Sequence, residues 1–315
     1  MEKSSNSKEL FYSKLSVISK IVSDRSSLNS ERMFFLTPMV VFMVGMILIP
    51  CLVLLYISFT NWEIGQSFSE AKFVGFRNYI RLFTTPRFWE DSLTTLYWIL
   101  GCLGIELPLG LGIALILKAA EERKVIGSKI FDTLFLLPLA VAPVVTAVMW
   151  RFMYNGSYGI INWFCQLFGL PRFDWLGSKY ALLSLIITDV WEFTPLFILL
   201  IFSALQTIPP QIEEAAKIDG ANYWRRLTRI IIPTIKPVLV TVFIIRTIDL
   251  LRWLVTIFIM TGGGPGTRTE ILNVLLYYTA FWQFSMDRAS ALAILMLGIG
   301  GLFAFISMKT FLKEA

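Results

Sequence analysis

Six long apolar stretches constrain this chain more than any other feature, because each is long enough to cross a lipid bilayer. A transmembrane helix needs about 20 predominantly apolar residues. With 56% hydrophobic residues and a mean hydropathy of +0.68, a soluble fold would expose large apolar areas to water. The sequence therefore predicts an all-α integral membrane protein with six transmembrane helices, at residues 34–60, 92–117, 130–153, 181–205, 233–260 and 289–311.

The positions of lysine and arginine predict which segments lie inside the cell. If both termini are cytoplasmic, the inner segments hold 17 of these residues, and the outer segments 61–91, 151–180 and 261–288 hold nine. This asymmetry follows the positive-inside rule for membrane proteins. The net charge of +6 therefore reports orientation in the membrane and does not indicate a nucleic-acid partner.

Composition divides the chain into a polar tail and a membrane-embedded part. Residues 1–33 are rich in serine and lysine and are predicted to form a cytoplasmic N-terminal tail. Residues 34–60 form the first transmembrane helix, and residues 92–311 form the core of the transmembrane domain. One helix of that core carries small residues that let a neighbouring backbone approach closely, and we expect it to be an inner packing element: Gly101, Gly104, Gly110 and Gly112.

The residues needed for common catalytic and metal sites are missing from the sequence. The chain has no histidine, and its three cysteines are scattered without metal-ligand spacing. The run "GGGPGTRT" lacks the Gly-Lys pair of a phosphate-binding P-loop. We therefore expect no catalytic residue and no metal site in this chain.

Charged residues interrupt the apolar sequence at 209–233, "PPQIEEAAKIDGANYWRRLTRIIIP". Pro210 suits the first turn of a helix, and Glu213 and Glu214 are favoured near its positive N-terminus. Gly220 can adopt the left-handed turn that ends a helix, and Asn222 can cap a second one. Taken alone, this pattern is also typical of a solvated connector helix.

The spacing in this segment resembles a known motif. Glu214-Ala215-Ala216, three residues, Gly220, nine residues and Ile230-x-Ile232-Pro233 are similar to the EAA loop of binding-protein-dependent ABC importer permeases. That pattern ends in Ile-x-Leu-Pro, and here Ile232 replaces the leucine.

Other stretches resemble the carbohydrate-uptake branch of the same family, which includes the maltose and glycerol-phosphate permeases. They are "FVGFRNY", "IINWFCQLFGL", "LQTIPPQIEEAAKIDGA", "MTGGGPGTRTEIL" and "ASALAI", and the resemblance covers residues 34–311. The chain departs from this branch at Leu254-Val255, where many relatives carry Phe-Asp before the Gly-Gly-Pro turn.

The resemblance implies a role for the interrupting segment and a set of partners. Residues 210–221 would be a coupling helix that docks on a separate ATPase subunit, through Glu213, Glu214, Ala215, Ala216, Asp219 and Gly220. The partners would be a second homologous permease, two ATP-binding cassette ATPase subunits, an extracytoplasmic solute-binding protein and a carbohydrate. The complex would lie in a bacterial cytoplasmic (inner) membrane. ATP and Mg would be used by the ATPase, and this chain would bind no cofactor itself.

Charged and aromatic residues inside two of the predicted helices mark a candidate solute path, because ionisable groups at membrane depth are costly. Interhelical ion pairing, or contact with the partner permease, explains them equally well. Asp249 lies three positions from both Arg246 and Arg252 and could neutralise either. A free Arg246 would suit an acidic or phosphorylated solute. The candidate residues are Asp189, Trp191, Glu192, Phe193, Leu196, Arg246, Asp249, Leu250 and Trp253.

Two other classes of protein remain as alternatives. An ion-coupled secondary transporter of a polar solute would show repeated halves and helices broken at matching positions, and neither pattern is evident. A membrane-embedded enzyme would need a nucleophile and a base, which the sequence does not offer.

Overall fold

The computed structural model describes residues 36–125 and 134–311. The chain divides into two compact units, Met1–Tyr56 and Ile57–Ala315, and each is described by itself. In the first unit, the described residues belong to the helix Leu36–Ser58, whose apolar side chains are almost all exposed. This helix lies within the predicted first span, whereas the predicted tail at 1–33 is outside the described residues.

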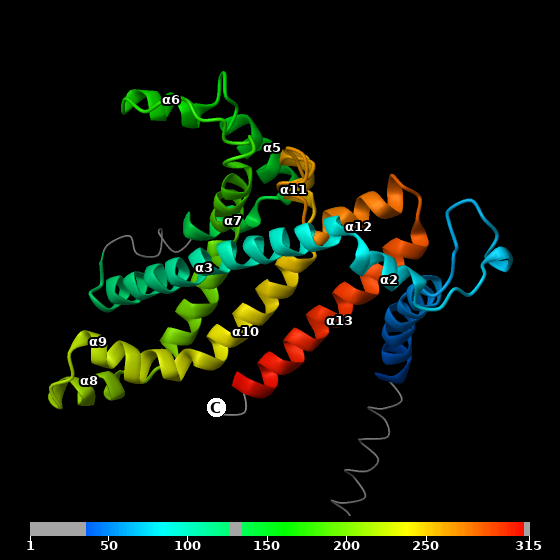
Figure 1. The fold of residues 1–315 in the computed structure, drawn as a ribbon. Helices are drawn as coiled ribbons and strands as arrows, with labels where there is room; N and C mark the ends of the chain where they lie inside the picture. Colours follow the sequence, from blue (N-terminus) through cyan, green and yellow to red (C-terminus); the bar gives the residue numbers. More distant parts are fainter. Residues whose placement is uncertain (1–35, 126–133, 312–315) are drawn as a thin grey trace, which may run out of the picture. The chain divides into compact units, whose positions relative to one another are not determined.

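Long apolar helices dominate the second unit (Figure 1). Among the described residues, the helices long and apolar enough to cross a membrane are Leu36–Ser58, α3 (Pro86–Glu122), α7 (Ala181–Gln206), the continuous stretch Tyr223–Leu251 and α13 (Met286–Phe311). A sixth span results if the bent pair Leu134–Ala140 and Pro143–Met153 is counted as one. The prediction of an all-α membrane protein is confirmed.

The third predicted span, 130–153, is not one straight helix. Leu134–Ala140, which includes the short helix η2 (Leu137–Ala140), meets α5 (Pro143–Met153) at an angle of 104°. Pro143 occupies the first turn of α5, and the preceding Ala142 is extended, with ψ of 136°. A residue before proline disfavours the helical conformation, so the chain breaks here. Residues 130–133 lie outside the described part.

The fifth predicted span, 233–260, is shifted toward the N-terminus. It begins at α9 (Tyr223–Arg226), passes through the π-helical turn η3 (Leu227–Ile231) and continues as α10 (Ile232–Leu251). Near its end, the side-chain amide of Asn273 donates to the carbonyl of Arg252. That carbonyl is thereby satisfied without a further helical turn, and α11 (Val255–Met260) is a separate helix.

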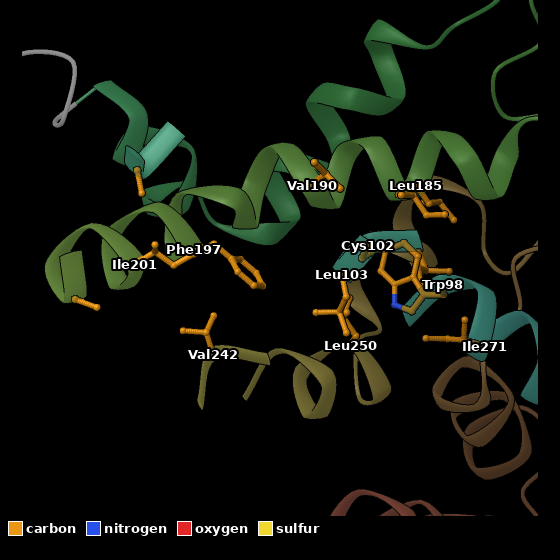
Figure 2. Packing of buried hydrophobic residues seen from close by; sticks show 14 of the residues in the cluster. Trp98, Cys102, Leu103, Leu185, Val190, Phe197, Ile201, Val242, Leu250 and Ile271 are labelled. Atoms are coloured by element: carbon orange, nitrogen blue, oxygen red, sulfur yellow. The ribbon is translucent and has the colours of Figure 1, made fainter. Parts of the chain in front are cut away.

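Close packing of α3 against α7 forms the centre of the core. A Cβ at Gly110 would lie 2.4 Å from Cβ of Phe197, and one at Gly101 would lie 2.6 Å from the side chain of Ile186. Two glycines of α3 thus have the packing role expected from the sequence, while Gly104 and Gly112 face open space within the described residues. Figure 2 shows Trp98, Leu103 and Cys102 of α3 among the buried residues of this core.

Smaller elements lie near the N-terminal end of α3. They are α2 (Arg77–Thr84) and α12 (Leu272–Phe281), which follows the glycine-rich turn 261–270, whereas η1 (Phe68–Glu70) precedes α2 in the chain. A second apolar cluster of Leu82, Phe88, Leu272, Leu275, Ala291, Leu292 and Met296 joins α2, α3, α12 and α13. The helix α6 (Ile160–Leu167) lies between α5 and α7 in the chain.

Candidate functional site

Three fully buried charged side chains meet where α3, α7 and α10 pack together. Arg246 of α10 donates from Nε and Nη2 to the carboxylate of Glu106 on α3, with distances of 3.1–3.4 Å. The same Nη2 donates to Oδ2 of Asp189 on α7. All three side chains are 0% exposed. Because buried charges are tolerated only when paired, this charged triad holds the three helices in one arrangement.

Two aromatic rings cover the guanidinium of Arg246. Its Cζ lies 3.8 Å from the ring centroid of Phe193 and 5.7 Å from that of Trp253. The two rings meet edge to face, with centroids 4.9 Å apart. A desolvated cation over an aromatic face is stabilised by the ring quadrupole, so the aromatic side chains add to the pairing of this arginine.

A second aromatic pair lines a cavity on another face of α7. Trp150 of α5 and Trp191 of α7 have ring centroids 5.7 Å apart. They form part of the wall of a cavity of about 500 Å³ between α3, α5 and α7, which also contains Thr194. Mostly apolar cavities of this size with a few polar groups are typical of small-molecule sites.

Buried polar atoms around the middle of α7 lack hydrogen-bond partners among the described residues. Some are donors, one is a carboxylate acceptor, and one hydroxyl is both. Such atoms in a native protein call for an explanation, for example an unseen water or ligand. They are Oγ1 of Thr194, Nε1 of Trp150 and Trp253, Oδ1 of Asp189 and Nη1 of Arg246.

Four of the nine predicted solute-path residues come together at the triad: Asp189, Phe193, Arg246 and Trp253. Trp253 reaches the triad from beyond the end of α10 at Leu251. Trp191 lines the neighbouring cavity instead.

The remaining predicted path residues lie elsewhere. Asp249 pairs with Arg252 at 2.8 Å, on an exposed part of the helix end, and has no ion pair with Arg246 within the described residues. Leu250 is fully buried in the hydrophobic core, Glu192 is buried, and Leu196 is half-buried.

Glu106 is the functional candidate that sequence reasoning missed. It is a single carboxylate inside the otherwise apolar run "GCLGIELPLG", 140 residues from its partner Arg246. An ionisable residue within a span is a functional candidate by default. That rule alone could have found it, although the identity of its partner depends on the tertiary fold.

The segment 209–233 forms one short helix and the first turns of the long helix Tyr223–Leu251, where its sequence predicts two short helices. The short helix is α8 (Pro210–Ile218), with Pro210 at its first position. Gly220 follows with φ of +74°, the left-handed conformation in which glycine commonly ends a helix. Oδ1 of Asn222 accepts a hydrogen bond from the backbone N–H of Arg225 at 2.8 Å, which caps α9.

The two glutamates of α8 have different surroundings. Glu213 pairs with Lys118 near the end of α3, and next to this contact Nε2 of Gln206 donates to Glu121 at 3.2 Å. Glu214 is exposed. One glutamate thus joins α8 to the membrane helices, while the other faces outward.

Apolar and small side chains of α8 and α9 are exposed beside Glu214. Ile218 is 87% exposed and Trp224 is 70% exposed. Ala215 and Asp219 are exposed as well, whereas Ala216 is buried against the rest of the chain. These side chains are not covered by the rest of the described chain.

Comparison with protein families gives a match over residues 107–313. The matching family is described as "Binding-protein-dependent transport system inner membrane component". The matched region begins inside α3, one residue after Glu106, and ends after α13, so it includes Asp189, Arg246 and the segment 209–233.

Curated relatives match most of the chain. The trehalose/maltose transport system permease protein MalF of Thermococcus litoralis is 35% identical over 247 residues, covering 78% of this chain and 82% of the relative. The sulfoquinovosyl glycerol transport system permease protein SmoG of Agrobacterium fabrum is 32% identical over 265 residues, covering 84% of each.

A solved structure shares the fold. A chain of a bacterial ABC transporter involved in the import of the acidic polysaccharide alginate superposes with a TM-score of 0.78 at 20% identity. The match covers 92% of this chain and 99% of that chain.

Proposed function

Because the chain belongs to the family of binding-protein-dependent transport system inner membrane components, we propose that it forms, with a second permease, the path of a carbohydrate. As a member, it is a non-catalytic, multi-pass membrane subunit of an ABC importer, which works with a binding protein and with ATPases. ATP is hydrolysed by those separate subunits.

The observation that carries the carbohydrate proposal is the set of unpartnered polar atoms around the middle of α7. It offers both donors, such as Nε1 of Trp253, and acceptors, such as Oδ1 of Asp189. A sugar hydroxyl is both donor and acceptor, and a sugar ring stacks well on aromatic side chains. The names of the relatives, which include trehalose/maltose and sulfoquinovosyl glycerol permeases, support the same class of solute.

The charges of the triad favour a neutral solute over an acidic one. Arg246 is already bound by Glu106 and Asp189, so two carboxylates face one guanidinium. An acidic sugar would have to displace one of them to reach the arginine. We therefore assign Arg246 to holding the path in shape, and assign solute contact to Trp191, Phe193 and Trp253.

The exposed face of α8 is proposed to dock on the ATPase. Glu214 would pair with a basic group of that subunit, while Ala215 and Gly220 allow close approach and Ile218 is buried by the contact. ATP-driven closure of the ATPases would push α8 as a body, and Lys118 would carry that movement into α3. Gly220→Pro tests this step, because proline cannot adopt the φ of +74°. Uptake at the wild-type rate in that variant would contradict the role of α8.

The proposed assembly contains this chain, a second homologous permease, two ATPase subunits and an extracytoplasmic solute-binding protein. A related transporter has been solved in complex with an alginate pentasaccharide-bound periplasmic protein, which supports the last of these partners. The lysine and arginine distribution supports cytoplasmic termini, and the family supports a bacterial cytoplasmic membrane.

Uptake into liposomes tests the function and separates it from the ion-coupled alternative. The complete complex should accumulate radiolabelled trehalose or maltose only with ATP inside and binding protein outside. A proton uncoupler should not change this accumulation. Sustained accumulation by this chain alone under an ion gradient would instead identify a secondary transporter. A matched acidic disaccharide tests the preference for a neutral solute.

A further inference from the structure

A hollow of about 350 Å³ lies where α2, α3, α12 and α13 meet. Its lining residues on α3 are at the beginning of that helix. Figure 1 shows α8 near the other end of α3. Its walls combine three arginines with hydroxyl and amide groups: Arg81, Arg87, Arg288, Thr84, Thr85 and Gln283. Neither the triad nor the docking face of α8 includes any of these residues.

Only one of the three arginines has a carboxylate partner among the described residues. Arg87 donates to both oxygens of the buried Glu270, with distances of 2.6–3.0 Å. Arg288 donates to the neutral Oγ of Ser285 at 2.6 Å and to Gln283 at 3.4 Å. For the exposed Arg81, the described residues provide no ion pair and no hydrogen bond to the guanidinium. Two positive charges are therefore available to an anion.

Exposed aromatic side chains on the same elements place the hollow at the membrane surface. Trp89 is 53% exposed and follows Arg87 and Phe88 on α3. Phe281, Trp282 and Phe284 are each more than half exposed and flank Gln283. Tryptophan and other aromatic rings collect at the depth of lipid headgroups. An anion bound here would lie at that depth.

An apolar groove adjoins the hollow and shares Phe88 with it. The groove has a volume of about 530 Å³ and runs between α3 and α13, lined by Phe83, Phe88, Trp89, Ser92, Thr95, Leu96, Ile99, Leu251, Leu272, Leu295 and Ile299. A soluble anion has no apolar part that could occupy such a groove. A molecule with an anionic head and an apolar chain would fill both.

We propose that the hollow binds the phosphate of an anionic phospholipid through Arg81 and Arg288, with one acyl chain lying in the groove. The arginine fork matches phosphate oxygens, and basic pockets between transmembrane helices suit acidic headgroups. Arg87 stays with Glu270 and shapes the hollow. The bound lipid would hold α2, α12 and α13 together at the beginning of α3. This assignment does not depend on which solute the protein carries.

Native mass spectrometry of the full-length chain in detergent tests the assignment. The probes are dioleoyl phosphatidylglycerol and the zwitterionic dioleoyl phosphatidylcholine, with excess sodium phosphate as competitor. We expect phosphatidylglycerol to bind preferentially and each of Arg81→Gln and Arg288→Gln to weaken it about fivefold. Arg172→Gln, an exposed arginine in the loop after α6, is the matched control and should not change the binding. Leu96→Trp, which fills the groove without altering charge, should also weaken it.

Several outcomes would overturn the proposal. Equal retention of the two lipids by the wild type would show that the site does not distinguish an anionic headgroup from a zwitterionic one. Unchanged binding in both arginine variants would exclude the hollow. Displacement of phosphatidylglycerol by sodium phosphate, together with unchanged binding in Leu96→Trp, would make the site one for a soluble anion. Gel filtration of each variant at the wild-type volume shows that a loss of lipid does not arise from unfolding.

Discussion

Lys118 of α3 and Glu213 of α8 form an ion pair between side chains that are 15% and 16% exposed. The pair joins α8 directly to a helix of the membrane core. Glu213 and its neighbour Glu214 therefore have separable roles, although the sequence presents them as equivalent.

Breaking this pair should uncouple ATP hydrolysis from uptake. In Lys118→Ala or Glu213→Gln, α8 loses one charge-assisted contact, of about 1 kcal/mol for a half-buried pair, so uptake per ATP should fall about fivefold. Proteoliposome transport and ATPase assays on the same preparation measure this ratio. The exchanged variant Lys118→Glu/Glu213→Lys should recover most of it, and a ratio that stays at the wild-type value in the single variants would contradict the role of the pair.

Removal of Glu106 should destabilise the membrane domain far more than removal of Asp249. In Glu106→Ala, the buried Arg246 keeps one carboxylate instead of two, and breaking a buried pair costs about 3–5 kcal/mol. Asp249 pairs with Arg252, which is 73% exposed, and an exposed pair contributes about 1 kcal/mol or less. Thermal unfolding in detergent, followed by tryptophan fluorescence, measures both variants. Equal melting temperatures in the two variants would contradict the inference that the buried triad stabilises the membrane domain more than the exposed pair does.

Addition of a single methyl group should change the stability differently at two glycines of α3. Gly110→Ala places a Cβ 2.4 Å from Cβ of Phe197, so α3 and α7 must move apart, at a cost of about 1–3 kcal/mol. Gly104→Ala meets nothing within 4 Å among the described residues and gains helix propensity, so it should be neutral or slightly stabilising. Urea or thermal unfolding of the two variants in the same detergent provides the comparison. The reverse order of stability would mean that α3 and α7 do not touch at Gly110.

Loss of the Asn222 cap should loosen α9 without affecting the membrane core. Asn222→Ala removes the acceptor for the N–H of Arg225, which typically costs about 1 kcal/mol. Amide hydrogen exchange should accelerate about fivefold in Tyr223–Arg226 and stay unchanged in α7. Asn222→Asp keeps the cap and serves as the control. Acceleration spread evenly over the whole chain would point to a global effect instead.

Local signals in the sequence predicted several elements well. Pro210, Gly220 and Asn222 each act within one turn of their own position, and the structure has the helix start, the left-handed turn and the cap that they indicate. The long apolar stretches likewise predicted the spanning helices. Their ends were less well predicted, because the end of α10 depends on Asn273, a residue from another element.

The candidate site was only partly predictable, because its pairing joins distant residues. Asp249 is the near neighbour of Arg246 along the helix, and the sequence offered it as a partner. In the fold Arg246 pairs with Glu106 and Asp189, which are 140 and 57 residues away. The 104° bend before α5 was also hidden, since a proline at 143 permits a kinked span as well as a broken one.

Two ion pairs anchor α3 to other parts of the molecule, one near its beginning and one near its end. Arg87, near its beginning, is tied to the turn 261–270 through Glu270, and Lys118, near its end, is tied to α8. At 1.5 Å per residue these anchors are about 47 Å apart, more than the thickness of a bilayer's hydrocarbon core. One continuous helix thus joins the two anchors, so under the coupling proposed for α8 a movement of that helix would reach the turn 261–270 without passing through any loop.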